Sequence, residues 1–279
     1  MVEKLPIMPD QAIMGLMNAR FVLRGSLLAV TALALVVMAV LLFTEAGRRL
    51  IFPPPVPPPP NIEASPGIIP SLPGGLVEWS KYGESDYQPV GRGFVLKLPD
   101  GTVVGVTTAH SIGFEAGPRN IALALGERTQ RVLEFDTFHG EPGRARSGED
   151  MTVDYVLLHG PIGLSIDPAL ILDPDSRGLP QAGERVALYT LLNDQPRRFD
   201  GAVLSSDPSA VWVVMDEVFD PSGLSGSPFI SLYTGKVIGM AIATTRRGGK
   251  VLLGLHPIGS LVEKAQAAKT FPKIADYHR

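Results

Sequence analysis

Short apolar or β-branched runs separated by turn residues fill the chain from residue 76 onward. Many short strands without intervening helices indicate an all-β sandwich or barrel. The last two runs are joined by Arg246-Arg247-Gly248-Gly249, whose glycines allow the positive φ of a hairpin turn. An alanine-rich, amphipathic stretch at 260–271 predicts a terminal helix. The predicted strands are 93–98, 102–109, 120–125, 131–138, 154–158, 185–190, 210–215, 236–244 and 250–255.

Residues 25–43 form an apolar segment without a charged side chain. Its 19 residues approach the roughly 20 that an α-helix needs to cross a bilayer. A cleaved signal peptide has a shorter apolar core of about 7–15 residues. We therefore expect an uncleaved single-span membrane anchor, and the alternative is an unusually long signal sequence.

Basic residues flank this segment unequally. Lys4, Arg20 and Arg24 precede it, whereas Arg48 and Arg49 follow it. Positive charge favours the cytoplasmic side of a membrane span. We expect a cytoplasmic N-terminus and a C-terminal domain outside the cytoplasm.

A proline-rich segment follows the apolar run, with ten prolines in residues 53–73. Proline lacks a backbone N–H and fixes φ, so the segment cannot form a helix or a central strand. A stiff polyproline II stalk is expected, and a docking site for a proline-binding module is the alternative. The predicted organisation is an N-terminal segment 1–24, a transmembrane helix 25–43, a linker 44–75, a β-domain 76–271 and a tail 272–279.

Composition excludes several classes of protein. The chain has no cysteine, so it can form neither a disulfide nor a thiolate metal site. A net charge of −3 argues against a broad nucleic-acid-binding surface, and we expect no nucleic-acid partner. No His-Glu-x-x-His pattern occurs, so we expect no metal site.

The first candidate motif is PSGLSGSPF at 221–229, in which Gly223 and Gly226 flank Ser225. Glycine lets the backbone adopt torsions that aim successive N–H groups into one space. Converging N–H groups are what an oxyanion hole requires. Taken alone, a cluster of glycine, serine and proline is more often an ordinary turn.

Two further motifs contain a histidine and an aspartate. His110 closes the apolar run VVGVTTAHSI, and Asp154 immediately precedes the strand YVLL within DMTVDYVLL. Each residue alone has an ordinary structural explanation. Together they give the chain order His, Asp, Ser, which differs from the orders of α/β-hydrolases and subtilisins.

With these motifs the chain resembles the trypsin-like serine proteases. Thr107-Thr108-Ala109-His110 is similar to the family's T-A-A-H, and Asp154 with its apolar strand is similar to D-[apolar]-A-L-L. Residues 223–228 are similar to G-[DN]-S-G-[GS]-P, and GKVIGMA (235–241) and LGLHPI (253–258) resemble the strands flanking the substrate pocket. The resemblance covers about 76–270, and the anchor and linker are most like the bacterial trypsin/HtrA group.

The resemblance implies a double six-stranded β-barrel, with barrels at about 76–175 and 176–258 and a C-terminal helix. It implies a serine endopeptidase in which Ser225 is the nucleophile, His110 the base and Asp154 its partner. The N–H groups of Gly223 and Ser225 would form the oxyanion hole, and the substrate would be a protein or peptide. We expect no PDZ domain to follow.

Three points qualify the resemblance. Leu224 stands where the family usually has Asp or Asn, and Ser227 replaces the second glycine. Asp150 is a rival for Asp154, which we favour because the apolar strand starts directly after it. Phe219, six residues before the serine, is expected at the base of the primary pocket.

Two other classes of function remain open. One is a catalytically silent trypsin-fold domain that serves as a membrane-tethered binding module. The other is a membrane β-domain unrelated to proteases. Retention of serine, histidine and aspartate disfavours the first, because a binding module needs none of the three for chemistry.

The uncharged segment 25–43 predicts that the full-length protein fractionates with membranes and that a chain starting near Gly74 stays in the supernatant. The measurement is immunoblotting of membrane and soluble fractions after a carbonate wash. Recovery of a native soluble form cut near residue 46 would instead support a cleaved signal sequence.

Overall fold

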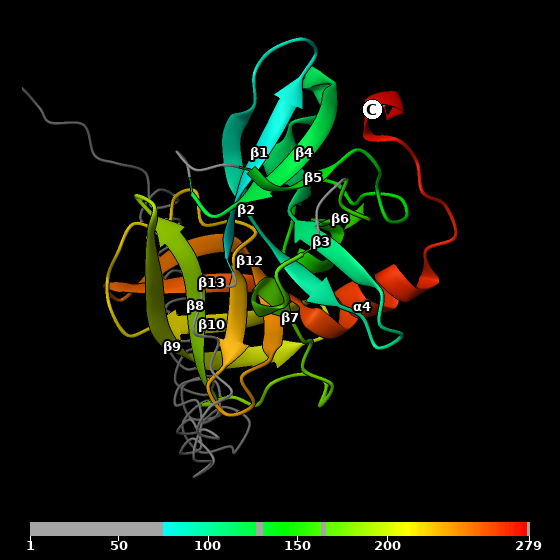
Figure 1. Ribbon diagram of the computed structural model, residues 1–279. Helices are drawn as coiled ribbons and strands as arrows, with labels where there is room; N and C mark the ends of the chain where they lie inside the picture. The colour runs from blue at the N-terminus through cyan, green and yellow to red at the C-terminus, as the bar shows by residue number, and fades with distance from the viewer. Residues whose placement is uncertain (1–74, 127–130, 163–165, 278–279) are drawn as a thin grey trace, which may run out of the picture. The chain divides into compact units, whose positions relative to one another are not determined.

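The computed structural model describes residues 75–126, 131–162 and 166–277 (Figure 1). They fall within the second of two structural units of the chain, 56–279. The predicted N-terminal segment, membrane span and proline-rich linker lie outside the described residues. Within the described ranges, no helix has the length and apolar character needed to cross a membrane.

The first sheet is built from the N-terminal strands in the order β5-β4-β1-β2-β3-β6, and β7 pairs in parallel with β2. Neighbours along the β5–β6 path are antiparallel. The strands are β1 (Leu76–Tyr82), β2 (Gln88–Lys97), β3 (Val103–Thr107), β4 (Pro118–Ala124), β5 (Arg131–Phe135), β6 (Val156–His159) and β7 (Ile171–Leu172).

This sheet is open, so the prediction of a closed first barrel was wrong. Beyond β5 the chain meets β6 at the isolated bridge between Phe138 and Leu158, where His139 N–H donates to Leu157 O (2.8 Å) and His159 N–H to Thr137 O (2.9 Å). Along its other edge the same stretch bonds to the C-terminal segment, where Phe138 N–H donates to Pro272 O (2.9 Å) and Ile274 N–H to Asp136 O (2.8 Å). Its hydrogen bonds are thus divided between two partners, and no continuous ladder closes the sheet.

The second sheet is a closed barrel in the order β10-β13-β12-β11-β8-β9, which confirms a six-stranded barrel for this half (Figure 1). Its hairpin turn has positive φ at both Gly248 (57°) and Gly249 (75°), as the sequence predicted. The strands are β8 (Arg185–Leu192), β9 (Gln195–Asp207), β10 (Ala210–Met215), β11 (Pro228–Ser231), β12 (Val237–Arg247) and β13 (Lys250–Pro257).

Few residues are helical. The terminal helix α4 spans Ile258–Ala267, so the predicted range 260–271 began and ended too late. Ala268 already has extended torsions, and the chain after it turns to bond with the segment around Phe138. The remaining helices are short: α3 (Ala109–Ile112), η1 (Phe114–Ala116), η2 (Met151–Val153), η3 (Pro168–Leu170) and η4 (Ile274–Asp276).

The side chains of β2 pack against both halves of the domain, because successive side chains of a strand point to opposite faces. Val95 packs into the cluster inside the first sheet. Phe94 and Leu96 pack into a second cluster with Met240 of the barrel and Leu261 of α4. A continuous apolar layer therefore lies between the sheets and supports the loops described next.

Candidate active site

His110 lies in the short helix α3, which begins two residues after β3 ends. The neighbouring Ala109 and Ile112 are buried in the core of the first sheet, whereas the His110 side chain is 34% exposed. The helix ends at Gly113, whose φ of 61° is left-handed. This turn fixes the backbone of His110 and leaves its imidazole accessible.

Asp154 holds both the side chain and the backbone of His110. Its Oδ2 lies 2.7 Å from Nδ1 of His110, and its Oδ1 accepts the N–H groups of Ala109 (2.8 Å) and His110 (3.1 Å). The N–H of Arg146 also donates to Oδ2, at 3.3 Å. The carboxyl is nearly completely buried, so these donors replace the water that it loses.

The ionisation state of Asp154 follows from its surroundings. Burial acts to raise the pKa of this carboxyl, but the hydrogen bond and charge of His110 and the backbone donors outweigh burial and lower the pKa below its ordinary value. An ionised carboxylate only accepts hydrogen bonds, so Nδ1 of His110 carries the proton. The other ring nitrogen, Nε2, is then free to accept a proton.

Asp150, the rival aspartate, has a different role. It caps η2 by accepting hydrogen bonds from the N–H (2.8 Å) and hydroxyl (2.7 Å) of Thr152. Its side chain is exposed, and its hydrogen bonds are local to this turn. The structure thus places Asp154, and not Asp150, against His110.

The loop that carries Ser225 is a series of tight turns. Asp220 accepts from Ser222 N–H (3.1 Å), Pro221 O accepts from Leu224 N–H (3.2 Å), and Leu224 O accepts from Ser227 N–H (3.0 Å). The Leu224 side chain is buried in the barrel core, only 1% exposed. Packing of this apolar side chain anchors the loop from below.

Two backbone hydrogen bonds fix Ser225 between the sheets. Its carbonyl accepts the N–H of Arg92 on β2 (3.0 Å), and the next N–H, of Gly226, donates to Ala241 O on β12 (2.8 Å). Gly226 has φ of 92°, and a Cβ at this position would lie 1.8 Å from Arg92 O. Only glycine allows the loop to approach β2 this closely.

The N–H groups of Gly223 and Ser225 are the two donors that the sequence predicted for an oxyanion hole. Neither donates to any protein acceptor within the described residues. Gly223 has φ of 74°, a conformation that glycine adopts without steric cost. With no protein acceptor among the described residues, these two N–H groups are available to a bound ligand.

The structure connects Ser225 to His110 through Arg92 and Thr107. Arg92 binds Ser225 through its N–H and accepts the Thr107 hydroxyl on its carbonyl (2.8 Å). Thr107 ends β3, three residues before His110. Of the three predicted triad members, His110 and Asp154 are in direct contact, whereas no hydrogen bond joins the described side chains of His110 and Ser225.

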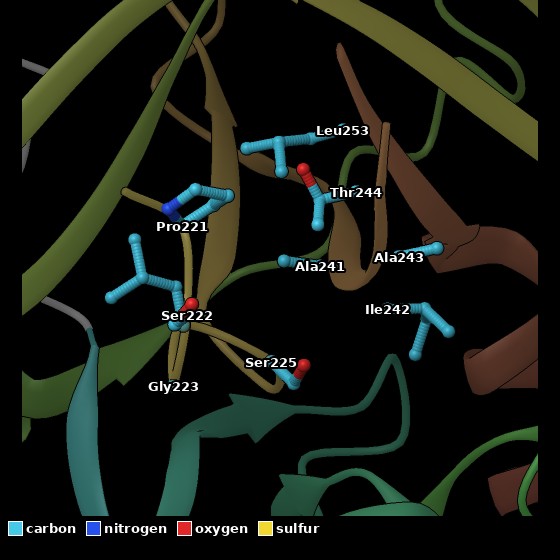
Figure 2. A pocket seen from close by; sticks show the side chains of 10 residues that line it. Pro221, Ser222, Gly223, Ser225, Ala241, Ile242, Ala243, Thr244 and Leu253 are labelled. Atoms are coloured by element: carbon cyan, nitrogen blue, oxygen red, sulfur yellow. The ribbon is translucent and has the colours of Figure 1, made fainter. Parts of the chain in front are cut away.

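A pocket of about 120 Å³ opens beside Ser225 (Figure 2). Figure 2 shows the serine loop facing the Ala241–Thr244 stretch across it. Phe219 is not among the lining residues, and its ring instead stacks on Phe199 at 4.1 Å between centroids. The lining residues are Pro221, Ser222, Gly223, Leu224, Ser225, Ala241, Ile242, Ala243, Thr244 and Leu253.

Buried polar residues beneath this site were not predicted from the sequence. Glu78 on β1 is fully buried and contacts Thr107 and Ser111, which precede and follow His110. Its strand was not recognised, and an isolated glutamate gives no sequence signal. Over the described ranges, no group of three or more His, Cys, Asp or Glu side chains is arranged to hold a metal ion.

Solved structures provide the comparison with known proteins. The active form of the Rv3671c protease from M. tuberculosis matches with a TM-score of 0.50 at 16% identity, over 77% of this chain and 91% of that one. Two other matches have lower TM-scores. Tobacco etch virus protease in complex with product matches with a TM-score of 0.48 at 15% identity, over 74% of this chain and 83% of that one. The HtrA-type protease AlgW with a tripeptide matches with a TM-score of 0.47 at 15% identity, over 71% of this chain and 60% of that one. No family model and no curated protein matches the chain. The described residues thus have a trypsin-like protease fold.

Gly226→Ala is predicted to disable this site, because its Cβ would collide with Arg92 O and push the serine loop off β2. Displacement of a reacting group by about 1 Å can lower a rate roughly 100-fold. The measurement is the rate of covalent labelling of Ser225 by a fluorophosphonate.

Gly259→Ala is the matched control, because a Cβ there meets no atom within 4 Å. Labelling of the Gly226→Ala protein at the wild-type rate would show that the close approach of the loop to β2 is not required.

Proposed function

We propose that this chain is a membrane-anchored serine endopeptidase that cleaves peptide bonds through His110, Asp154 and Ser225. The observation that carries the proposal is the Asp154–His110 hydrogen bond of 2.7 Å, linked through Thr107 and Arg92 to a serine loop with two unpaired N–H groups. The trypsin-like protease fold supports the same conclusion. The anchor is segment 25–43, and we propose a cytoplasmic N-terminus and an extracytoplasmic protease domain.

In the proposed reaction the Ser225 hydroxyl attacks the carbonyl carbon of a bound peptide, and Nε2 of His110 takes its proton. Asp154 holds the Nδ1–H tautomer and stabilises the imidazolium that forms. The developing oxyanion accepts hydrogen bonds from the N–H groups of Gly223 and Ser225. Each donor contributes about 2.7–4 kcal/mol of transition-state stabilisation in sites of this kind.

The second half of the reaction uses the same groups. His110 protonates the leaving amine, and an acyl-enzyme remains on Ser225. Water, deprotonated by His110, then attacks the ester, and the tetrahedral intermediate collapses to release the acid and restore the serine. Every proton moves through Nε2, so the scheme uses no metal and no organic cofactor.

A binding module is the second candidate function, and one observation favours it. The Ser225 hydroxyl makes no hydrogen bond with His110 in the described residues. Catalytic hydrogen bonds are often long in unliganded enzymes and shorten when substrate binds, so this observation does not exclude catalysis. Chemistry at Ser225 distinguishes the two functions.

Leu224 indicates how the oxyanion hole is held. In digestive relatives, as the family resemblance implies, a new N-terminal ammonium pairs with an aspartate at this position. A buried ammonium next to Leu224 would have no countercharge, which is costly. Leu224 is instead packed in the barrel core, so we propose that the hole forms without N-terminal cleavage.

Ser225→Ala and His110→Ala are each predicted to abolish peptidase activity without unfolding the domain. Asp154→Asn should lower the turnover number by about 10⁴-fold, because the amide no longer holds the reactive tautomer. The measurement is hydrolysis of a peptide library by the full-length protein in detergent, with circular dichroism as the test of folding.

Asp150→Asn is the matched control, since Asp150 only caps η2. It should retain activity within a few-fold of wild type. A result in which Asp150→Asn is inactive and Asp154→Asn is active would contradict the assignment.

The pocket beside Ser225 predicts cleavage after small or medium apolar residues. Its walls include Ile242, Ala243 and Leu253, and no charged side chain lines it. Profiling with the peptide library should show Ala, Val or Leu before the cleaved bond.

The variant Ala243→Leu narrows the pocket and should shift this preference toward glycine and alanine. Efficient cleavage after Lys or Arg by the wild-type protein would refute this assignment of the pocket.

A further inference from the structure

Glu78 is a buried carboxyl directly beneath the proposed catalytic histidine. It lies on β1 with no exposed surface, and Gly91 on β2 leaves room for it, since a Cβ there would lie 2.7 Å from Glu78 Oε2. Oε2 contacts the hydroxyls of Thr107 (2.6 Å) and Ser111 (2.8 Å). Oε1 has no hydrogen-bond partner among the described residues.

The hydrogen atoms available at Thr107 favour a neutral Glu78. Thr107 Oγ1 lies 2.6 Å from Glu78 Oε2 and 2.8 Å from Arg92 O. A hydroxyl has one hydrogen to donate, and both a carboxylate and a carbonyl can only accept. If Glu78 is ionised, one of these two contacts therefore has no hydrogen between its oxygens.

A protonated Glu78 satisfies both contacts of Thr107. Its Oε2–H donates to Thr107 Oγ1, whose own hydrogen donates to Arg92 O. Ser111 can still donate to Oε2, and the unpartnered Oε1 is then a carbonyl oxygen rather than part of a buried charge. An unpartnered carbonyl oxygen costs less than an unpartnered, buried carboxylate oxygen.

The chain of hydrogen bonds ends at Ser225. Arg92 accepts the Thr107 hydrogen on its carbonyl, and its N–H donates to Ser225 O at 3.0 Å. The same Arg92 carbonyl is the atom that a Cβ at position 226 would strike. Glu78 is thus connected to the serine loop through Thr107 and Arg92, and to both sides of His110 through Thr107 and Ser111.

The charged and titratable groups around Glu78 come from three elements. The hydrogen bonds of Thr107 and Ser111, and then the charges of His110 of α3 and Arg92 of β2, act to lower the pKa of Glu78. Burial and then the charge of Glu78 raise the pKa of Tyr82, on the same strand as Glu78. β3 contributes the hydroxyl of Thr107, and β4 places the apolar Leu123 opposite Glu78 in the ladder. Burial outweighs the lowering effects and raises the pKa of Glu78 to about 7.

We propose that Glu78 is a positioning residue whose protonated side chain completes a hydrogen-bond chain through Thr107 to Arg92. This chain holds His110 and Ser225 in the relative positions that the reaction requires. This proposal rests on the proposed function. Ionisation of Glu78 breaks the chain at Thr107, because the one hydroxyl hydrogen can then reach either Glu78 or the Arg92 carbonyl but not both. Reactivity therefore falls as the pH rises above the pKa of Glu78.

The test is the pH profile of the fluorophosphonate labelling rate between pH 5 and 9.5, measured on the full-length protein in detergent. Wild type should show a rising limb, as the base loses its proton, and a falling limb above neutral pH of about tenfold, the effect of one lost hydrogen bond. Glu78→Gln places an amide donor toward Thr107 at all pH values. Its profile should rise and then remain flat.

Matched variants separate positioning from a general structural effect. Glu184→Gln changes another buried glutamate, one held by Arg177 and Ser231 in the barrel, and should keep the falling limb. Thr107→Ser retains the hydroxyl and should keep the wild-type profile. Thr107→Val removes it and should lower labelling at every pH, including the pH where wild type is fastest.

A second measurement detects the ionisation of Glu78 without relying on catalysis. The raised pKa means that folded protein binds this proton more tightly than unfolded protein, whose value is near 4.5. The contribution to stability is fully present below pH 4.5 and is lost as the pH rises through about 7. The urea midpoint of wild type should fall over this range relative to that of Glu78→Gln.

The outcomes distinguish this proposal from the proposed function. Two results would show that the neutral form of Glu78 does not position the site: a Glu78→Gln protein that is labelled but keeps the falling limb, or one that is folded yet unreactive at every pH. In either case labelling of the wild-type protein would leave the peptidase assignment in place. If neither protein labels at any pH, the proposed function fails, and the positioning role fails with it. A urea midpoint difference that is independent of pH would also overturn the proposal.

Discussion

The hydrogen bond from Arg92 N–H to Ser225 O joins the two halves of the domain at the site where chemistry is proposed. It can form only because residue 226 is glycine, since a Cβ there would overlap the Arg92 carbonyl. This contact brings the serine loop of the barrel to the strands that lead into His110.

The two halves stabilise their parts of the site by different means. Asp154 is a buried charge that is satisfied by His110 and by three backbone N–H groups, so its position is set by directional bonds. The serine loop is held by the burial of Leu224 in an apolar core, and its N–H groups at 223 and 225 are left without a protein acceptor among the described residues. An apolar anchor at this position leaves no countercharge for an activating N-terminus.

The sequence predicted the parts that depend on local pattern. Apolar runs located most strands, and the sequence motifs pointed to His110 and Asp154, whose side chains lie in direct contact. The strand β9 was missed because it is rich in charged residues, such as Arg197, Arg198 and Asp200, that face solvent along much of its length. The open first sheet, the stacking of Phe219 on Phe199 and the contacts of Glu78 each depend on residues distant in the chain, which no local pattern reports.

A crystal structure of the protein reacted with a peptidyl boronate that carries a small apolar side chain tests the central claim most directly. We predict a covalent bond from boron to Ser225 Oγ, a boronate oxygen within hydrogen-bonding distance of the N–H groups of Gly223 and Ser225, and His110 Nε2 hydrogen-bonded to the adduct. An unmodified Ser225 with the peptide bound elsewhere, or an adduct whose oxygen points away from both N–H groups, would contradict the account.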